Sequence, residues 1–256
     1  MKKNSVYLFL FLGLSLCFHA GYAQLPAADI IQTKKGDLSI QPVFHGALVL
    51  NMGQKTLFVD PYNGANAYKS LGTPDLILIT DIHQDHMDTT TLNAINTSQA
   101  KLIVPQAVAD LLPAKYKDKL VVLNNGQTID MFDISIMAIP MYNLPEDETS
   151  RHTKGRGNGY VLTFGGKRIY ISGDTEDIPE MRSLKKINVA FVCMNQPFTM
   201  TIEQAASAVL EFKPKIVYPY HFRGREGLSD VEAFKGMVTK DNKKIEVRLR
   251  DWYVKQ

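Results

Sequence analysis

The stretch that decides the fold is LILITDIHQDHMD, residues 76–88. Its first four residues form an apolar run, which is typical of a strand buried on both faces of a sheet. Two histidines and three aspartates follow that run within nine residues. Rigid sheets commonly present functional side chains on the loops at their strand ends. The stretch therefore predicts a buried strand that ends in a functional site.

Residues of the same chemical types stand beside predicted strands elsewhere. His221 and Asp174 each follow an apolar run. His152 lies in a glycine- and charge-rich loop before another run, and His45 precedes the first hairpin. One such histidine is most simply a polar residue in a turn. The whole set is better explained by metal binding, because imidazole and carboxylate suit zinc and also iron or manganese.

The spacing within the motif has a geometric meaning. If the chain stays extended after Ile79, Asp81 and His83 project to the same side. Asp85 and His86 are adjacent, so they diverge unless the chain turns there. One short loop could thus serve two neighbouring metal ions.

Apolar runs and turn signals predict a strand-rich chain with helices between some strands, which favours sheets covered by outer helices. Residues 201–212 predict a helix capped by Thr201 and Gln204, and Ser229 with Glu232 predicts the start of another. Residues 88–96 and 106–112 are weaker helical patterns. The predicted strands are 47–50, 56–59, 76–80, 101–104, 121–123, 134–139, 160–164, 168–172, 189–193 and 215–218.

Two segments echo each other, LVLNMGQKTLFVD (48–60) and VLTFGGKRIYISGD (161–174). Each pattern predicts a strand, a tight turn containing glycine and lysine, and a second strand that is followed by an aspartate. They are either two ordinary hairpins or the marks of a duplicated half-domain. The residues alone favour ordinary hairpins, because the hairpin signal is generic.

Bulk composition bounds the class of protein. The 256 residues suffice for one large domain or two small ones, and a net charge of +3 without a dense basic patch gives little support to a nucleic-acid partner. Residues 1–23 have a basic start, an apolar stretch and small residues before the expected cleavage after Ala23, which predicts a secretory signal peptide. The mature chain, residues 24–256, is then a periplasmic or secreted domain with no stable membrane anchor. It retains Cys193 alone, so no internal disulfide is expected.

TDIHQDHMD resembles the H-x-H-x-D-H signature of the metallo-β-lactamase-fold hydrolase superfamily. Asp60 in LFVDP, GDT at 173–175 and His221 match further motifs in order, over about residues 40–222. The lactonase-like, single-domain branch is the most similar. The resemblance implies an α/β fold, a four-layer αββα sandwich of two similar halves, and it strengthens the duplication hypothesis.

The resemblance also implies a ligand set. Asp174 would bridge two metal ions, and Asp60 would orient ligands without binding. The first ion would take Asp81, His83 and His152, and the second would take Asp85, His86 and His221. The expected cofactor is one or two zinc ions, with Mn²⁺ or Fe²⁺ as alternatives.

This chain departs from the family pattern at two places. Asp81 stands where most members have histidine, and either His152 or Asn143 could complete the first site. With three carboxylates and a hydroxide around two divalent ions the cluster would be neutral. We therefore expect Asp81 to weaken the Lewis acidity of the first ion, raise the pKa of bound water and favour harder metals.

The implied chemistry is hydrolysis, in which a metal-bound hydroxide attacks a small ester, lactone or phosphodiester. A metal-bound water, Asp85 or His45 could protonate the leaving group, so Asp85 and His45 are candidate catalytic residues, although His45 could equally be a packed structural residue. Arg151, Lys154, Arg156 and Arg223 could bind an anionic group, but a solvated charged surface is the simpler interpretation. The alternatives are a β-lactam hydrolase and a metal-stabilised, non-catalytic binding protein. A small-molecule substrate is expected, and the sequence leaves the oligomeric state open.

Overall fold

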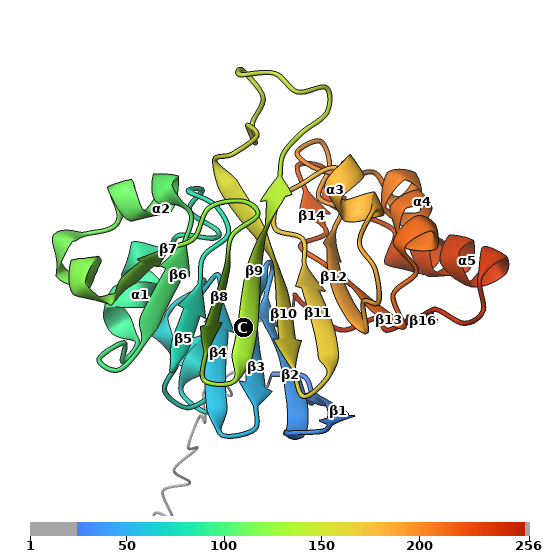
Figure 1. Ribbon diagram of the computed structural model, residues 1–256. Helices are drawn as coiled ribbons and strands as arrows, with labels where there is room; N and C mark the ends of the chain where they lie inside the picture. The colour runs from blue at the N-terminus through green and yellow to red at the C-terminus, as the bar shows by residue number, and fades with distance from the viewer. Residues whose placement is uncertain (1–24, 254–256) are drawn as a thin grey trace, which may run out of the picture.

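The computed structural model describes residues 25–253, and the predicted signal peptide lies outside the described residues. Two seven-stranded sheets pack face to face between two outer layers of helices (Figure 1). The first sheet is covered by α1 (Thr89–Ala94) and α2 (Gln106–Leu111). The second is covered by α3 (Pro179–Arg182), α4 (Ile202–Phe212) and α5 (Val231–Asp241). The predicted αββα sandwich is confirmed.

The two sheets share one plan. Each begins with four consecutive antiparallel strands and continues with three strands parallel to the fourth. The first contains β1 (Asp29–Thr33), β2 (Gly36–Phe44), β3 (Ala47–Met52), β4 (Lys55–Val59), β5 (Leu76–Leu78), β6 (Lys101–Val104) and β7 (Leu120–Val122). The second contains β8 (Thr128–Met131), β9 (Ile134–Met141), β10 (Gly157–Phe164), β11 (Lys167–Ile171), β12 (Val189–Cys193), β13 (Ile216–Tyr220) and β16 (Glu246–Val247).

The two echoing segments occupy equivalent places in this plan, as the hairpins β3–β4 and β10–β11. The two halves therefore repeat one strand plan, which agrees with the duplication hypothesis, and both segments are hairpins. A short hairpin of β14 (Arg223–Gly224) and β15 (Gly227–Leu228) follows β13. Two 3₁₀ helices, η1 (Ala65–Tyr68) and η2 (Ala114–Lys119), complete the described elements.

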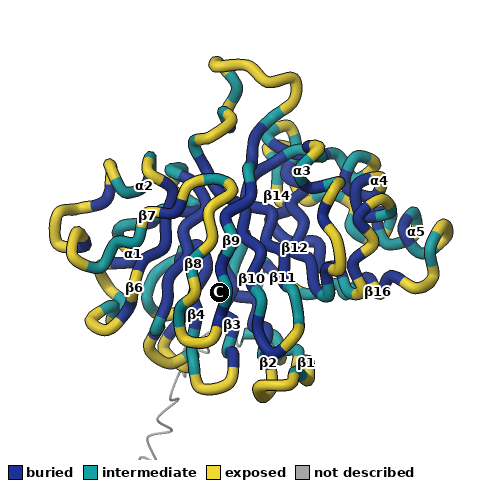
Figure 2. Tube along the Cα trace, in the orientation of Figure 1, coloured by how far each residue is buried: buried dark blue, intermediate teal, exposed yellow. Residues whose placement is uncertain are grey.

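The apolar runs are continuous because each central strand has two buried faces (Figure 2). Along β5, Leu76 and Leu78 face the core between the sheets, whereas Ile77 faces the core beneath α1 and α2. Successive side chains of a strand point to opposite faces, so alternate residues supply two different cores. The strand that precedes the motif is therefore held rigidly on both sides.

Side chains cap the starts of α4 and α5. The predicted capping box of α4 is confirmed, with Thr201 and Gln204 each bonded to the other's backbone N–H. The predicted cap of α5 is wrong by one residue, because the Asp230 carboxylate accepts the bond from the Ala233 N–H. Ser229 instead donates its hydroxyl to the carbonyl of Met194. Within residues 25–253, no helix has the length and apolarity that crossing a membrane requires.

Candidate metal centre

The site lies at the carboxyl ends of parallel strands, where open α/β sheets usually place their ligands. The motif follows β5, Asp174 follows β11, and His221 follows β13. His152 comes from the 142–156 connection between β9 and β10, which projects at the top of Figure 1. The chain does not stay extended through the motif. A turn forms where the N–H groups of His86 and Met87 donate to the carbonyl of His83.

Asp81, His83 and His152 form the first group of potential ligands. His83 Nδ1 lies 2.6 Å from Asp81 Oδ2, and His152 Nε2 lies 4.0 Å from the same oxygen. Asn143 contacts this group through His152. Its side-chain oxygen accepts bonds from the N–H and Nδ1 of His152, and it thereby orients the imidazole.

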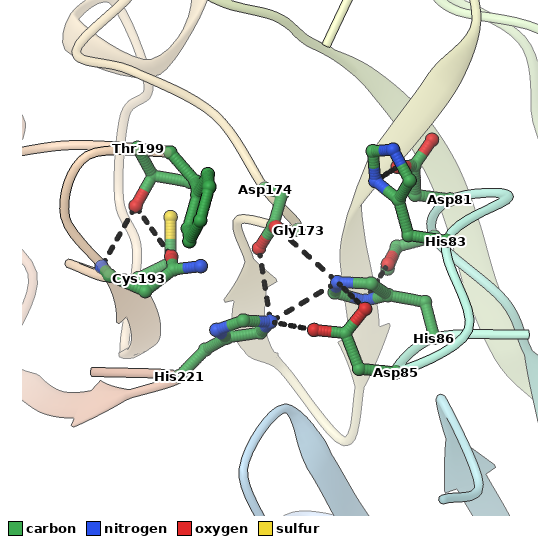
Figure 3. A network of polar contacts seen from close by, with 12 residues as sticks. Asp81, His83, Asp85, His86, Gly173, Asp174, Cys193, Thr199 and His221 are labelled. Carbon is green, nitrogen blue, oxygen red and sulfur yellow. Dashed lines mark hydrogen bonds and ion pairs between the residues drawn. The ribbon is translucent and has the colours of Figure 1, made fainter. Parts of the chain in front are cut away.

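His86, Asp174 and His221 form the second group, and Asp85 lies beside it (Figure 3). The two oxygens of Asp174 lie 3.4 Å from His86 Nε2 and 3.4 Å from His221 Nε2. Asp85 Oδ2 lies 3.3 Å from His221 Nε2. Asp174 Oδ2 also lies 3.3 Å from His152 Nε2, so this carboxylate stands between the two groups.

Hydrogen bonds fix the orientation of His86. Its Nδ1 lies 2.8 Å from Asp60 Oδ2 and donates to that carboxylate, which leaves Nε2 free to act as a ligand. Thr80 holds Asp60 in turn, through its backbone N–H at 2.8 Å and its hydroxyl at 2.6 Å. A carboxylate that receives the second N–H of a metal-binding histidine fixes its tautomer and raises its basicity.

The residues fit a metal ion. His152 Nε2 and Asp174 Oδ1 are buried and have no hydrogen-bond partner. His86 Nε2 and His221 Nε2 face each other at 3.2 Å. An unsatisfied buried polar atom costs about 1–3 kcal/mol, so several of them converging on one place would be destabilising without a cation. Nitrogen and carboxylate donors in this number suit zinc, manganese or iron.

Electrostatics keep the carboxylates ionised. Burial alone would raise the pKa of Asp174 and Asp85, but the neighbouring imidazoles of His86 and His221 outweigh it and hold both pKa values well below the usual range. For His86, burial would lower the pKa, but Asp174, Asp85 and Asp60 together raise it well above its usual value. A cation that binds here must therefore displace a proton from His86.

Arg156 pairs with Asp81, a contact that the sequence did not reveal. Its Nε lies 3.1 Å from Oδ1 and its second guanidinium nitrogen lies 2.9 Å from Oδ2, a bidentate pair with a fully buried carboxylate. The neutral cluster expected from the sequence omits this guanidinium. With Arg156 included, the positive charge lost by having aspartate at position 81 is restored. The Arg156 guanidinium would offset part of the effect expected of Asp81 on a bound ion, and Arg156 is not free to bind substrate.

His45 lies beside Asp85, with Nε2 3.2 Å from Asp85 Oδ2. Its Nδ1 lies 2.9 Å from the hydroxyl of Tyr253, which also accepts bonds from the N–H groups of Phe222 and Arg223. That hydroxyl therefore donates to Nδ1, and the imidazole proton sits on Nε2, facing Asp85. Burial and the neighbouring His221 lower the pKa of His45 to about 4, so it is neutral at pH 7. No motif in the sequence marks Tyr253.

An open cleft of about 390 Å³ lies over the centre. Its lining includes His83 of the first group, Asp85 beside the second group, and His45. The remaining lining residues are Phe44, Tyr62, Gln84, Arg151 and Arg223. A small molecule in this cleft would therefore contact His83 of the first group and Asp85 beside the second.

Known proteins resemble this chain over most of its length. A family model described as a β-lactamase superfamily domain matches residues 39–221. A metal-dependent hydrolase of Pyrococcus abyssi is 30% identical over 207 residues, covering 76% of this chain and 89% of that protein. A solved structure from Parabacteroides distasonis, assigned as a metal-dependent hydrolase, is 38% identical with a TM-score of 0.77, covering 90% of this chain and 99% of that one.

A metallo hydrolase from Ignicoccus hospitalis shares the fold, with a TM-score of 0.70 at 23% identity over 83% of this chain and 94% of its own. The sandwich, the groups of potential metal ligands and the similarity of the whole domain agree. The chain therefore belongs to the β-lactamase superfamily and is a metal-dependent hydrolase with the metallo-β-lactamase fold.

Proposed function

We propose that this chain is an exported hydrolase that holds two metal ions, with zinc favoured over manganese or iron, and cleaves a small ester, lactone or phosphodiester. The observation that carries the proposal is the position of Asp174 between the two groups of potential ligands. The first ion would be held by Asp81, His83 and His152, the second by Asp85, His86 and His221, and Asp174 would contact both. When bound, the metal supplies Lewis acidity and makes water a stronger acid.

The protein's own groups move the proton. Asp85 is 28% exposed and reaches the cleft, and its depressed pKa keeps the carboxylate ionised at pH 7. We infer that Asp85 accepts the proton of the attacking water and returns it to the leaving group. The neutral imidazole of His45 donates its Nε2–H to Asp85 Oδ2 and so holds that carboxylate in place. His45 is thus a positioning residue in this proposal.

The metal content and turnover of the mature chain test the proposal. Residues 24–256 should carry two equivalents of zinc by elemental analysis and hydrolyse at least one member of an ester, lactone and phosphodiester panel. Asp174→Ala should lose metal and turnover together. Asp177→Ala is the matched control, because Asp177 pairs with Arg182 outside the ligand groups. An Asp174→Ala protein that keeps both its metal and its turnover would contradict the proposal.

Export rests on the first 23 residues alone, whose pattern is that of a cleaved signal. Fractionation of cells that express the whole chain, compared with cells that express a chain lacking residues 2–23, tests it. The whole chain should be found outside the cytoplasm in a form shortened at Ala23. Recovery of the unshortened chain from the cytoplasm would contradict export without affecting the hydrolase.

A further inference from the structure

The cationic side chains near the site divide into two kinds. Lys154 lies 2.8 Å from Glu146 and 3.6 Å from Glu180, and Arg156 is bound to Asp81. These charges are already neutralised by carboxylates of the protein. Arg151 and Arg223 differ, because both line the cleft and neither forms an ion pair with any carboxylate among residues 25–253.

Aromatic rings support both of these guanidinium groups. Arg151 lies over Phe198 at 4.5 Å from the ring centre. Arg223 lies over Tyr253 at 4.1 Å and over Phe44 at 5.7 Å. Stacking on a ring restrains the planar guanidinium while its N–H donors remain available at the edge. Both arginines are therefore restrained at the cleft before any ligand binds.

Tyr253, which supports Arg223, is also part of the site. The Tyr253 hydroxyl that accepts its backbone N–H also bonds to His45, which in turn contacts Asp85. One side chain, Tyr253, thus supports Arg223 directly and the proposed base Asp85 through His45. The lining of the same cleft includes the aromatic residues Phe44 and Tyr62, which suit a short apolar linker.

From this arrangement we infer that the substrate carries a carboxylate or phosphate group separate from its scissile bond, and that Arg151 and Arg223 bind that group. The inference rests on the proposed hydrolytic site. This inference narrows the expected substrates from esters or lactones in general to those that carry a negative charge. Guanidinium donors bind planar oxyanions through charge-assisted hydrogen bonds, which are about twice as strong as neutral ones. A neutral substrate would leave both arginines without partners.

Matched pairs of probes separate this inference from the proposed function. Glutarate and valerate have the same chain length, and only glutarate has a second carboxylate for the arginines while the first faces the metal. Calorimetric titration of the zinc-loaded protein at low ionic strength should show glutarate binding about tenfold more tightly. Their 4-nitrophenyl esters, mono(4-nitrophenyl) glutarate and 4-nitrophenyl valerate, should show a similar preference in kcat/KM.

Arg223→Leu and Arg151→Leu should each remove most of that preference. Arg225→Leu is the matched control, because Arg225 is also an exposed arginine over Phe198, at 5.5 Å, but it does not line the cleft. A structural role would instead lower binding of both probes equally and keep their ratio. Equal affinity of wild-type protein for glutarate and valerate overturns the inference. Absence of ester turnover with the glutarate preference intact contradicts the ester hydrolysis and leaves the anion site supported.

Discussion

Replacing Arg156 with leucine should destabilise the metal-free protein and tighten its binding of cations. The Asp81 carboxylate is fully buried and the Arg156 side chain is 19% exposed, with about 3 Å between their charged atoms. At an effective dielectric of about 20, their attraction is roughly 5 kcal/mol. Removing one partner of a buried pair costs about 3–5 kcal/mol. Because Arg156 is partly exposed and His83 also contacts Asp81, we expect about 2–3 kcal/mol of lost unfolding free energy.

The metal affinity changes in the opposite sense, because the guanidinium repels a cation. Counting the three carboxylates and Arg156, the protein's charge around the centre is −2 in the wild type and −3 in Arg156→Leu. Asp81→His alone makes the charge −1, and the double variant returns it to −2. We therefore expect zinc affinity to be highest in Arg156→Leu, similar in wild type and double variant, and lowest in Asp81→His. Neighbouring steps should differ by at least about tenfold.

Urea unfolding in the presence of a chelator measures the stability, and competition with a chromogenic zinc chelator measures the affinity. The four proteins form a double-mutant cycle, so the coupling between positions 81 and 156 is obtained directly. Two results would refute the charge-compensation argument. One is a double variant that binds zinc no better than Asp81→His, and the other is weaker binding by Arg156→Leu than by the wild type.

Three further predictions follow from the surroundings of the ligands. Tyr253→Phe removes the hydroxyl that holds His45, so kcat should fall about tenfold while the zinc content stays the same. An unchanged kcat would show that the tautomer of His45 does not affect the reaction. Gly46→Ala places a methyl group 2.9 Å from His221 Cδ2 and should weaken zinc binding about tenfold, whereas Gly236→Ala in α5, which meets nothing within 4 Å, should not. Zinc affinity should rise with pH from 6 to 8, because the pKa of His86 is raised and zinc binding must release its proton. The metal-free protein should lose the stability of its protonated His86 as pH rises through the same pKa. A zinc affinity that does not change with pH would contradict this.

Most strands with a continuous apolar run were predictable from the sequence, whereas β1, β2, β8 and β16 were not. β6 and β12 match their apolar runs because both faces of each strand are buried. β1 and β8 alternate between half-buried and exposed residues, and β2 contains Gly36 and Pro42, so their local signal is weak. These strands form because neighbouring strands pair with them, and pairing between distant segments is not visible in a short window.

The site residues likewise divide into those that a local sequence pattern predicts and those that it does not. The motif residues His83, Asp85 and His86 are marked by their spacing after a buried strand. The bond between Arg156 and Asp81 joins residues 75 positions apart, and that between Tyr253 and His45 joins residues 208 apart. Such partners depend on how the two sheets pack, which no local pattern encodes. The choice between Asn143 and His152 likewise depended on which way the 142–156 connection folds back.

The duplicated architecture has a consequence for the integrity of the molecule. The first half supplies Asp81, His83, Asp85 and His86, and the second supplies His152, Asp174 and His221. Neither half alone contains the donors for a complete coordination sphere. Chelation should therefore loosen the contact between the sheets at this rim before it affects either sheet separately, and hydrogen exchange of β5 and β11 amides should report that loss of cohesion.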